Sequence, residues 1–340
     1  MQIHVVQPGQ TLYGIAQAYG VRVETIATAN EINPEESLVV GQALVIPIYG
    51  RYHFVQPGQS LYTIAQLYGL DVATIALLNR IAPDQPLQVG WRLYIPPRMK
   101  RDIEVNAYVE PGEEVSESLR QQVEQVAPLL TYLAPFSFQI QRDGSLSRPN
   151  LDDFPAIAQN SQVTLMMVIT NLENERFSDE LAGVILNNVE LQNILLDNII
   201  ATAKELGFRD IHFDLEFIRP ADRDAYNAFL RRARERIHQE GIFMSTALAP
   251  KVSREQTGEW YTAHDYATHG ELADFVVIMT YEWGYSGGPP MPVSPIHAVR
   301  RVLEYALTEI PGDKILMGQN LYGYDWTLPY VPGGEYARAL

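Results

Sequence analysis

The pattern of hydrophobic and polar positions changes near residue 100, which predicts a boundary between two kinds of domain. Before it, two stretches each show a short strand, a Pro-Gly turn, a helix, a glycine, a second short helix and a closing strand. In the first helix of each stretch, apolar residues recur with the helical period and predict one face packed on a small core. These residues are Leu12, Ile15, Ala16 and Tyr19 in the first stretch and Leu61, Ile64, Ala65 and Tyr68 in the second. The pattern therefore predicts two small βααβ modules, at residues 1–48 and 51–97.

The two modules are copies of one sequence. Residues 6–30 read VQPGQTLYGIAQAYGVRVETIATAN, and residues 55–79 read VQPGQSLYTIAQLYGLDVATIALLN. Thr11 and Ser60 stand directly before the first helix of each copy, where a hydroxyl side chain is a favoured N-cap. The duplication predicts that both modules share one fold.

Beyond the boundary, nearly continuous apolar strands alternate with longer helices. The strands are expected at 103–109, 132–140, 163–170, 210–218, 242–250, 273–281 and 314–323. The helices between them are expected at 113–126, near 151, and at 191–206, 221–240, 259–269 and 295–308. Such alternation is typical of a parallel sheet covered by helices on its outer face, so residues 101–340 are expected to form a (β/α)8 barrel of the TIM type.

The expected barrel is incomplete, because only seven strands are found before Leu340. A barrel without its eighth strand leaves one edge of the first strand and one edge of the seventh strand unpaired. We therefore expect a C-terminally incomplete barrel, as in a shortened gene product.

Composition excludes several classes of function. A formal net charge of -16 argues against a nucleic-acid ligand, because affinity for phosphate backbones comes mainly from Lys and Arg. The absence of cysteine excludes disulfides, thiolate nucleophiles and cysteine-based zinc sites. No apolar run approaches the roughly 20 residues of a membrane span, and the N-terminus lacks the features of a secretory signal. No cluster of metal ligands stands out, so neither a metal nor a cofactor is expected.

Four polar residues alternate with apolar ones in the strand expected at 210–218. Asp210, His212, Asp214 and Glu216 fall on one face, which in a barrel is the interior. Glu216 would lie at the C-terminal rim, where the active sites of such barrels are found. Buried carboxylates are costly unless they are paired or functional, which favours catalytic groups over the alternative of a half-buried strand with a solvated edge.

Residues 2–97 resemble a tandem of LysM modules, in the motif VQPGQTLYGIA, in the asparagine after the second helix and in the closing VIP or YIP. The resemblance implies binding of peptidoglycan, chitin or another N-acetylglucosamine-containing glycan in a groove between two loops. The implied groove residues are Gly9, Gln10, Thr11, Leu12, Asn30, Ile32, Gly58, Gln59, Ser60, Leu61, Asn79 and Ile81. The alternative is that these residues serve only as turns and caps. Two weak sites in one chain would gain affinity on a repeating polymer.

The strand DIHFDLEFI resembles the D-x-x-D-x-D-x-E signature of family 18 glycoside hydrolases. The resemblance implies that Glu216 is the catalytic acid and Asp214 the carboxylate beside it. His212 stands where the signature has its penultimate Asp, and Arg209 where it has the first. His212 would then either hydrogen-bond Asp214 and keep it ionised, or be a core histidine with satisfied hydrogen bonds.

A second motif, IMTYEWG at 278–284, resembles the family's M-x-Y-D, with Glu282 in place of Asp. It implies that the Tyr281 hydroxyl binds the acetamido oxygen of the substrate. The implied substrate-binding residues are His212, Tyr108, Met279, Glu282, Trp283 and Tyr322. The resemblance further implies a retaining, substrate-assisted mechanism, in which the acetamido group itself attacks the anomeric carbon.

Several features resemble the spore-cortex glycosylases of endospore-forming bacteria: the tandem modules, the lack of an export signal, NAY in the first barrel strand and FDLEF in the fourth. This resemblance implies an N-acetylglucosaminidase that acts on cortex peptidoglycan during germination. Such an enzyme would be made in the mother-cell cytoplasm and deposited in the spore wall. The alternatives are a chitinase-like enzyme, or a non-catalytic wall-binding protein with an inactive barrel.

Overall fold

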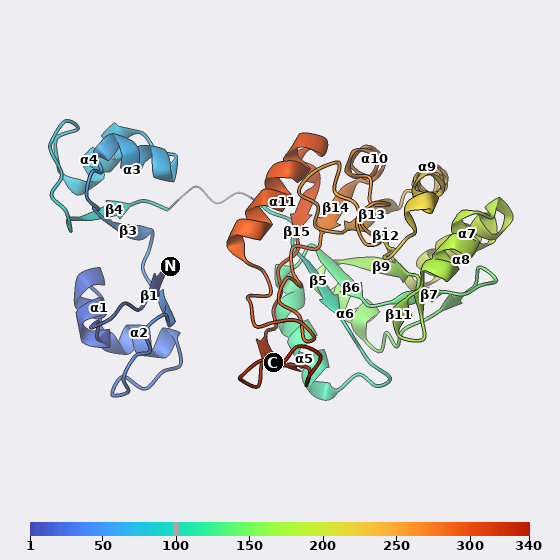
Figure 1. The fold of residues 1–340 in the computed structure, drawn as a ribbon, viewed down its shortest axis with the longest axis horizontal. Coiled ribbons are helices and arrows are strands. Elements are labelled where there is room, and N and C mark those ends of the chain that lie inside the picture. Colours follow the sequence, from blue (N-terminus) through green and yellow to red (C-terminus); the bar gives the residue numbers. More distant parts are fainter. Residues whose placement is uncertain (98–101) are drawn as a thin grey trace. The chain divides into compact units, whose positions relative to one another are not determined.

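The computed structural model describes residues 1–97 and 102–340 (Figure 1). The chain divides into two compact units, Met1–Asp102 and Ile103–Leu340. The first unit contains the duplicated sequence, and the second contains the alternating strands and helices.

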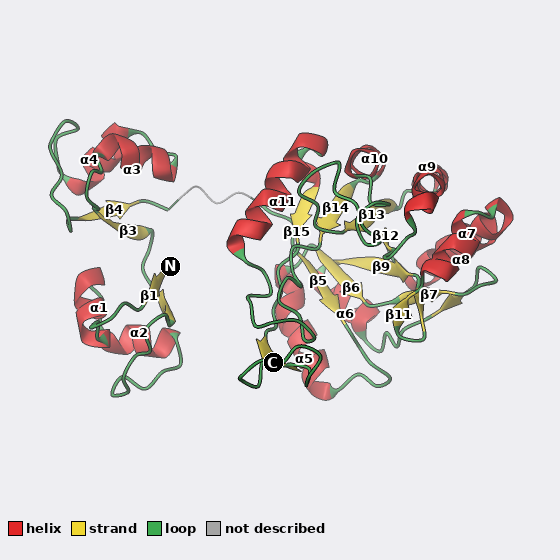
Figure 2. Ribbon diagram, viewed as in Figure 1, coloured by secondary structure: helices red, strands yellow, loops and turns green. Residues whose placement is uncertain are grey.

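Each N-terminal module consists of two helices beside an antiparallel pair of strands, as Figure 2 shows. The first comprises β1 (Gln2–Val5), α1 (Leu12–Tyr19), α2 (Val23–Ala29) and β2 (Ala43–Ile46). The second comprises β3 (Arg51–Phe54), α3 (Leu61–Tyr68), α4 (Val72–Asn79) and β4 (Arg92–Ile95). The βααβ prediction is therefore confirmed for both copies.

Local chemistry explains why both copies begin their first helix at the same place. Thr11 Oγ1 accepts the backbone N–H of Gly14 at 3.1 Å, and Ser60 Oγ accepts that of Thr63 at 3.3 Å. Each bond satisfies a backbone donor that has no partner within the helix. The helical faces predicted from the apolar period are buried, except that Tyr68 is only partly buried.

The two modules of the first unit contact each other. The Gln2 side chain pairs with the backbone of Tyr52, donating to its carbonyl at 2.9 Å and accepting its N–H at 2.7 Å. The Arg92 guanidinium donates to the carbonyl oxygen of Ala18 at 2.8 Å and lies 4.5 Å from the centre of the Tyr52 ring. These contacts join the modules through backbone groups as well as side chains.

The second unit is built on a curled sheet whose seven principal strands are parallel and follow one another in chain order. They are β5 (Asn106–Val109), β6 (Tyr132–Pro135), β9 (Thr164–Thr170), β12 (Asp210–Asp214), β13 (Phe243–Leu248), β14 (Phe275–Ile278) and β15 (Ile315–Met317). Among the described residues, no strand pairs with the outer edge of β5 or of β15. The architecture is the expected TIM-type barrel, open where an eighth strand would close it.

Helices lie around the outer side of this sheet (Figure 1). They are α5 (Glu117–Val126), α6 (Phe154–Ser161), α7 (Asp179–Leu186), α8 (Val189–Leu206), α9 (Arg223–Gln239), α10 (Tyr266–Leu272) and α11 (Ile296–Glu309). Within the described part of the chain, no single helix is long and apolar enough to cross a membrane. Among the helices of these described residues, α3 and α4 taken together, bent by 109°, are the one pair that meets the criteria of length and composition.

The observed strands are shorter than the predicted ones at their C-terminal ends. β12 stops at Asp214 rather than at 218, β14 stops at Ile278, and β15 stops at Met317. The chain leaves the sheet there to form loops, and Phe217 takes a left-handed φ of 54° that a strand does not allow. The predicted strand 132–140 is broken into β6 and a separate strand β7 (Phe138–Ile140), which pairs with β9 and with β8 (Leu146–Ser147).

The helices also differ from the prediction in two places. The helix expected at 259–269 begins only at Tyr266, because residues 249–265 form a long loop. Helix α7 was not expected; it follows a short hairpin of β10 (Leu172–Glu173) and β11 (Arg176–Phe177). Both the 249–265 loop and α7 lie at the C-terminal ends of the strands, where His264 contacts Leu215 and Asp179 contacts Arg219, two residues that follow β12.

Candidate active site

Strand β12 places its polar and apolar residues on opposite faces, as the alternation predicted. Ile211, Phe213 and Leu215 belong to the hydrophobic core that the sheet shares with the outer helices. Asp210, His212, Asp214 and Glu216 are all buried as well. Because buried polar groups are costly without partners, the contacts of these four residues define what the site can do.

His212 takes part in a chain of three hydrogen bonds inside the barrel. Its Nε2 lies 2.9 Å from the Tyr108 hydroxyl, and its Nδ1 lies 2.8 Å from Ser245 Oγ. Ser245 in turn donates its hydroxyl to Asp210 Oδ1 at 2.6 Å. Since the single hydroxyl hydrogen of Ser245 goes to Asp210, Nδ1 of His212 must be the donor to Oγ, and Nε2 must accept from Tyr108.

His212 is therefore a neutral imidazole with both nitrogens occupied. Burial lowers its pKa to about 3, in agreement with that assignment. Neither nitrogen is left for Asp214, so the hydrogen bond from His212 to Asp214 that the sequence suggested is not formed. His212 lies beneath the site as a histidine whose hydrogen bonds are satisfied, and Tyr108 acts as its partner.

Asp214 and Glu216 are close enough for their charges to interact. Burial raises the pKa of Glu216 to about 7, and burial together with the Glu216 charge raises the pKa of Asp214 well above its ordinary value. Asp214 Oδ1 is buried and has no hydrogen-bond partner among the described residues. A buried pair of carboxyl groups in which one charge disfavours the other, with one acceptor unused, has the properties of an acid and a ligand-binding group.

Tyr281 adjoins this pair from the loop after β14. Burial raises the pKa of its hydroxyl above the ordinary value, and the charges of Asp214 and Glu216 raise it further. Its ring packs against Gly318: a side chain there would place its Cβ 2.8 Å from Cε1 of Tyr281. The structure thus brings together the three residues predicted as catalytic, and Gly318 makes room for one of them.

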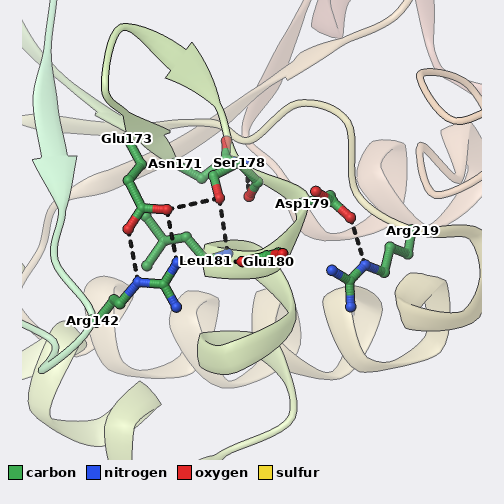
Figure 3. A network of polar contacts seen from close by, with 8 residues as sticks. All are labelled: Arg142, Asn171, Glu173, Ser178, Asp179, Glu180, Leu181 and Arg219. Carbon is green, nitrogen blue, oxygen red and sulfur yellow. Dashed lines mark hydrogen bonds and ion pairs between the residues drawn. The ribbon is translucent and has the colours of Figure 1, made fainter.

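The backbone of Glu216 is held by Asn171, the residue that follows β9. Asn171 Oδ1 accepts the Glu216 N–H at 3.0 Å, and Asn171 Nδ2 donates to the Glu216 carbonyl oxygen at 2.9 Å and to that of Ser178 at 3.0 Å. Figure 3 shows Asn171 beside Ser178, together with the contact between Asp179 and Arg219. Ser178 caps helix α7, and Arg219, which follows the Glu216 loop, donates to Asp179 at 2.6 Å.

The loop between β13 and α10 holds the same segment from another direction. His264 Nε2 donates to the carbonyl oxygen of Leu215 at 3.0 Å, while its Nδ1 accepts the Ala249 N–H at 2.7 Å. The indole N–H of Trp260 donates to Glu216 Oε2 at 2.5 Å. Asn171, Ser245, Trp260 and His264 were all missed by sequence reasoning, because each belongs to a segment far from β12 in the chain.

The rim residues predicted to bind substrate differ in their contacts. Glu282 accepts the Tyr322 hydroxyl at 2.5 Å and that of Tyr324 at 2.9 Å, so it orients the aromatic loop after β15. Met279 is buried, and Trp283 packs against the hydrophobic cluster beneath α11. Glu282 and Tyr322 are therefore joined to each other, whereas Trp283 and Met279 contribute to packing.

In the LysM modules, most predicted groove residues also have a place in the fold. The Asn30 side chain donates to the carbonyl oxygens of Ile26 and Val45 and accepts the Val45 N–H, and Asn79 makes the equivalent three bonds. Gln10 Oε1 accepts the Gln7 N–H at 2.9 Å, and Gln59 repeats this at 2.8 Å. Leu12 and Leu61 are buried, and Ile32 and Ile81 pack beside them. Gly9 and Gly58 form the exposed turn of each module, with φ of 79° in both.

Among the described residues, no group of three or more His, Cys, Asp or Glu side chains is arranged to hold a metal ion. The polar groups at the centre of the sheet instead form the hydrogen-bonded chain and the carboxyl pair described above.

The buried Asp210 should make the stability of the second unit depend on pH. Burial raises its pKa from 3.8 to about 7, so the folded state favours the protonated form. The free energy of unfolding should then fall as pH rises from about 4 to about 7, by up to about 1.4 kcal/mol per pH unit. We expect Asp210→Asn to remove this component. Urea unfolding at pH 5 and pH 7.5, followed by tryptophan fluorescence, would show it; an identical pH difference in both proteins would contradict it.

Comparison with known proteins agrees with this geometry. The model of glycosyl hydrolases family 18 matches residues 107–336, and the LysM domain model matches residues 4–47 and 53–96. The chain is 64% identical over 341 residues to the cortical fragment-lytic enzyme of Bacillus subtilis (strain 168), covering 100% of this chain and 79% of that protein. It is 50% identical over 342 residues to the enzyme of the same name from Bacillus anthracis, again covering 100% and 79%.

A solved structure shows the same architecture. The crystal structure of the Bacillus cereus spore cortex-lytic enzyme SleL superposes with a TM-score of 0.86 at 46% sequence identity, covering 100% of this chain and 78% of that one. The family match covers most of the chain and contains the carboxyl pair at the end of β12. This chain is therefore a glycoside hydrolase that carries two LysM domains and belongs to glycosyl hydrolases family 18.

Proposed function

We propose that this enzyme cleaves N-acetylglucosaminyl bonds of spore-cortex peptidoglycan by a retaining, substrate-assisted mechanism. The observation that carries the proposal is the group formed by Glu216, Asp214 and Tyr281 at the C-terminal ends of β12 and β14. The names of the relatives, which refer to lysis of spore cortex, support the substrate. The place of action that we propose is the spore wall during germination, after synthesis in the mother-cell cytoplasm.

Glu216 is suited to protonate the glycosidic oxygen. Its pKa of about 7 leaves a large protonated fraction at neutral pH, where an acid catalyst is most effective. As the bond to the leaving sugar breaks, the acetamido carbonyl oxygen attacks the anomeric carbon and forms a cyclic oxazolinium ion. Water then attacks the same carbon and gives its proton to Glu216, while the bond from that carbon to the acetamido oxygen breaks. This restores the acid and the acetamido group and retains the configuration.

Asp214 and Tyr281 are suited to hold the acetamido group during this step. The unpartnered Oδ1 of Asp214 can accept the acetamido N–H, and the carboxylate stabilises the positive charge that develops on the ring. The Tyr281 hydroxyl stays protonated because its pKa is raised, so it can donate to the acetamido oxygen. The mechanism therefore requires an N-acetylated sugar, the same sugar that the LysM resemblance implies.

The requirement for the acetamido group provides the test of the proposed function. Soluble cortex fragments should yield new reducing ends at N-acetylglucosamine, and the same fragments after chemical de-N-acetylation should yield none. Borohydride reduction followed by mass spectrometry identifies the reducing sugar. Equal cleavage of both substrates would contradict the mechanism. Faster cleavage of chitin oligosaccharides of equal length would indicate a chitinase, and no product from any substrate would indicate a binding protein.

The LysM domains should hold the enzyme on insoluble wall without taking part in hydrolysis. We expect a chain that begins at Ile103 to lose at least about tenfold in cosedimentation with cortex sacculi, because two linked sites act at high effective concentration. Its hydrolysis of short soluble fragments should stay within about twofold of the full chain, since residues 103–340 form a separate compact unit. Unchanged cosedimentation would contradict the anchoring role.

A further inference from the structure

Three consecutive residues directly after β12 are each contacted by the loop of residues 249–265. His264 donates to the Leu215 carbonyl oxygen at 3.0 Å, and the indole N–H of Trp260 donates to Glu216 Oε2 at 2.5 Å. The Trp260 ring also stacks on Phe217, with ring centres 6.2 Å apart and planes inclined by 13°. One loop thus fixes the backbone before Glu216, a carboxyl oxygen of Glu216 and the side chain after it.

The contact between Trp260 and Glu216 makes the two carboxyl oxygens unequal. An indole N–H can only donate a hydrogen bond, so the carboxyl oxygen that it contacts is favoured as the unprotonated one. With Oε2 facing the indole, the acidic proton of Glu216 is favoured on Oε1. An acid catalyst works only when its proton points at the leaving-group oxygen, so the choice between the two oxygens affects the reaction.

The position of the indole is itself held. Phe217 is 43% exposed and has a φ of 54°, a conformation that costs a non-glycine residue about 1 kcal/mol or more. The hydrogen bond from His264 to the carbonyl oxygen of Leu215, two residues earlier, and the stack on Trp260 compensate for that cost. The result is that the indole and the carboxyl group keep one mutual orientation.

We propose that Trp260 is a positioning residue for the general acid, and that its indole N–H directs the acidic proton of Glu216 to Oε1. This inference rests on the proposed function, in which Glu216 is the acid. It concerns a residue outside the two sequence motifs that carry the family resemblance, in a segment where the sequence predicted a helix.

The other titratable groups around Glu216 set the background for a pH experiment. Asp214 lies beside it on β12, and Tyr281 approaches from the loop after β14. On the 249–265 loop, His264 is neutral because burial lowers its pKa to about 4, and the Lys251 ammonium donates to the His264 carbonyl oxygen at 3.3 Å. The Trp260 hydrogen bond lowers the pKa of Glu216 and opposes the larger effect of burial.

The deciding experiment compares Trp260→Phe and Trp260→His with the wild-type enzyme on soluble cortex fragments, across pH. Phenylalanine keeps a ring to stack on Phe217 and removes the donor. We expect kcat to fall about tenfold with KM changed less than about threefold, and the alkaline limb of kcat/KM to move to higher pH. The limb moves to higher pH because Glu216, without the hydrogen bond from the indole N–H, stays protonated to higher pH. Trp260→His restores an N–H and should recover part of kcat and return the limb toward its original position.

Glu216→Gln is measured in parallel, so that a failure of the inference can be told from a failure of the proposed function. If Glu216→Gln keeps its activity, the assignment of the acid is wrong. If that variant is inactive but Trp260→Phe leaves the alkaline limb in place, only the role of Trp260 is overturned. A higher KM with unchanged kcat in Trp260→Phe would also overturn it, since Trp260 would then be a surface for sugar stacking. A Trp260→His protein with no better kcat than Trp260→Phe would contradict the role of the N–H.

Discussion

Replacing Glu216 by glutamine should reduce kcat on soluble cortex fragments by about a thousandfold or more, with KM nearly unchanged. Glutamine has the same shape but carries no acidic proton, so the leaving sugar would depart as an unprotonated alkoxide. The fold should persist, because the amide oxygen still accepts the Trp260 N–H and the backbone bonds to Asn171 do not involve the side chain. Initial rates by reducing-end release, with thermal unfolding as the check on folding, measure both quantities.

Glu282→Gln is the matched control for this substitution. It makes the same chemical change at another carboxylate on the rim, where the side chain accepts hydrogen bonds from Tyr322 and Tyr324. An amide oxygen can still accept those bonds, so we expect a loss of less than about tenfold. Similar losses of kcat in the two variants would show that any carboxylate at the rim has this effect. Glu216 would then not be identified as the acid.

Replacing Asp214 by asparagine should lower kcat by about 100-fold to 1000-fold. The amide keeps one oxygen acceptor but cannot supply the negative charge that stabilises the oxazolinium ion. It also takes away the second ionisable group of the carboxyl pair, in which the Glu216 charge raises the pKa of Asp214, so the pH profile should lose the titration step of Asp214. Rates across pH on N-acetylated fragments measure both effects together.

Asp210→Asn separates the effect of Asp214→Asn from the general loss of a buried carboxyl group. It changes the same residue type on the same face of β12, but Asp210 is completely buried and bonds Ser245 rather than any group at the rim. We expect Asp210→Asn to change mainly the pH dependence of the free energy of unfolding, whereas Asp214→Asn should change mainly kcat. A larger loss of kcat in Asp210→Asn than in Asp214→Asn would contradict the assignment of Asp214.

The sequence predicted the strands of the second unit because their periodicity is a local property. Asp210, His212 and Asp214 alternate with buried apolar residues, so their common face follows from strand geometry alone. The modules at the N-terminal end were predicted for a similar reason, since the repeat and its helix caps are read within a few residues of each other.

The contacts that complete the site were not predictable in this way. Trp260 and Asn171 act on Glu216 across separations of 44 and 45 residues, and nothing in their own neighbourhoods indicates the partner. The ends of the strands were missed for the same reason, because tertiary contacts decide where the chain leaves the sheet. His212 shows a further limit: the sequence left open whether it bonds Asp214 or is a core histidine with satisfied hydrogen bonds. Only its contacts with Tyr108 on β5 and Ser245 on β13 decide for the second.

The contacts between the two LysM modules have a consequence for which glycan strands the tandem can bind. Gln2 and Arg92 tie the modules together through backbone groups, so we expect the two proposed sugar-binding surfaces to be held at one separation. A glycan strand is a series of identical steps, and a rigid pair can engage it at both surfaces only when the separation equals a whole number of steps. The tandem would then act as a ruler that selects long, regular strands, with no loss of affinity to the motion of a linker.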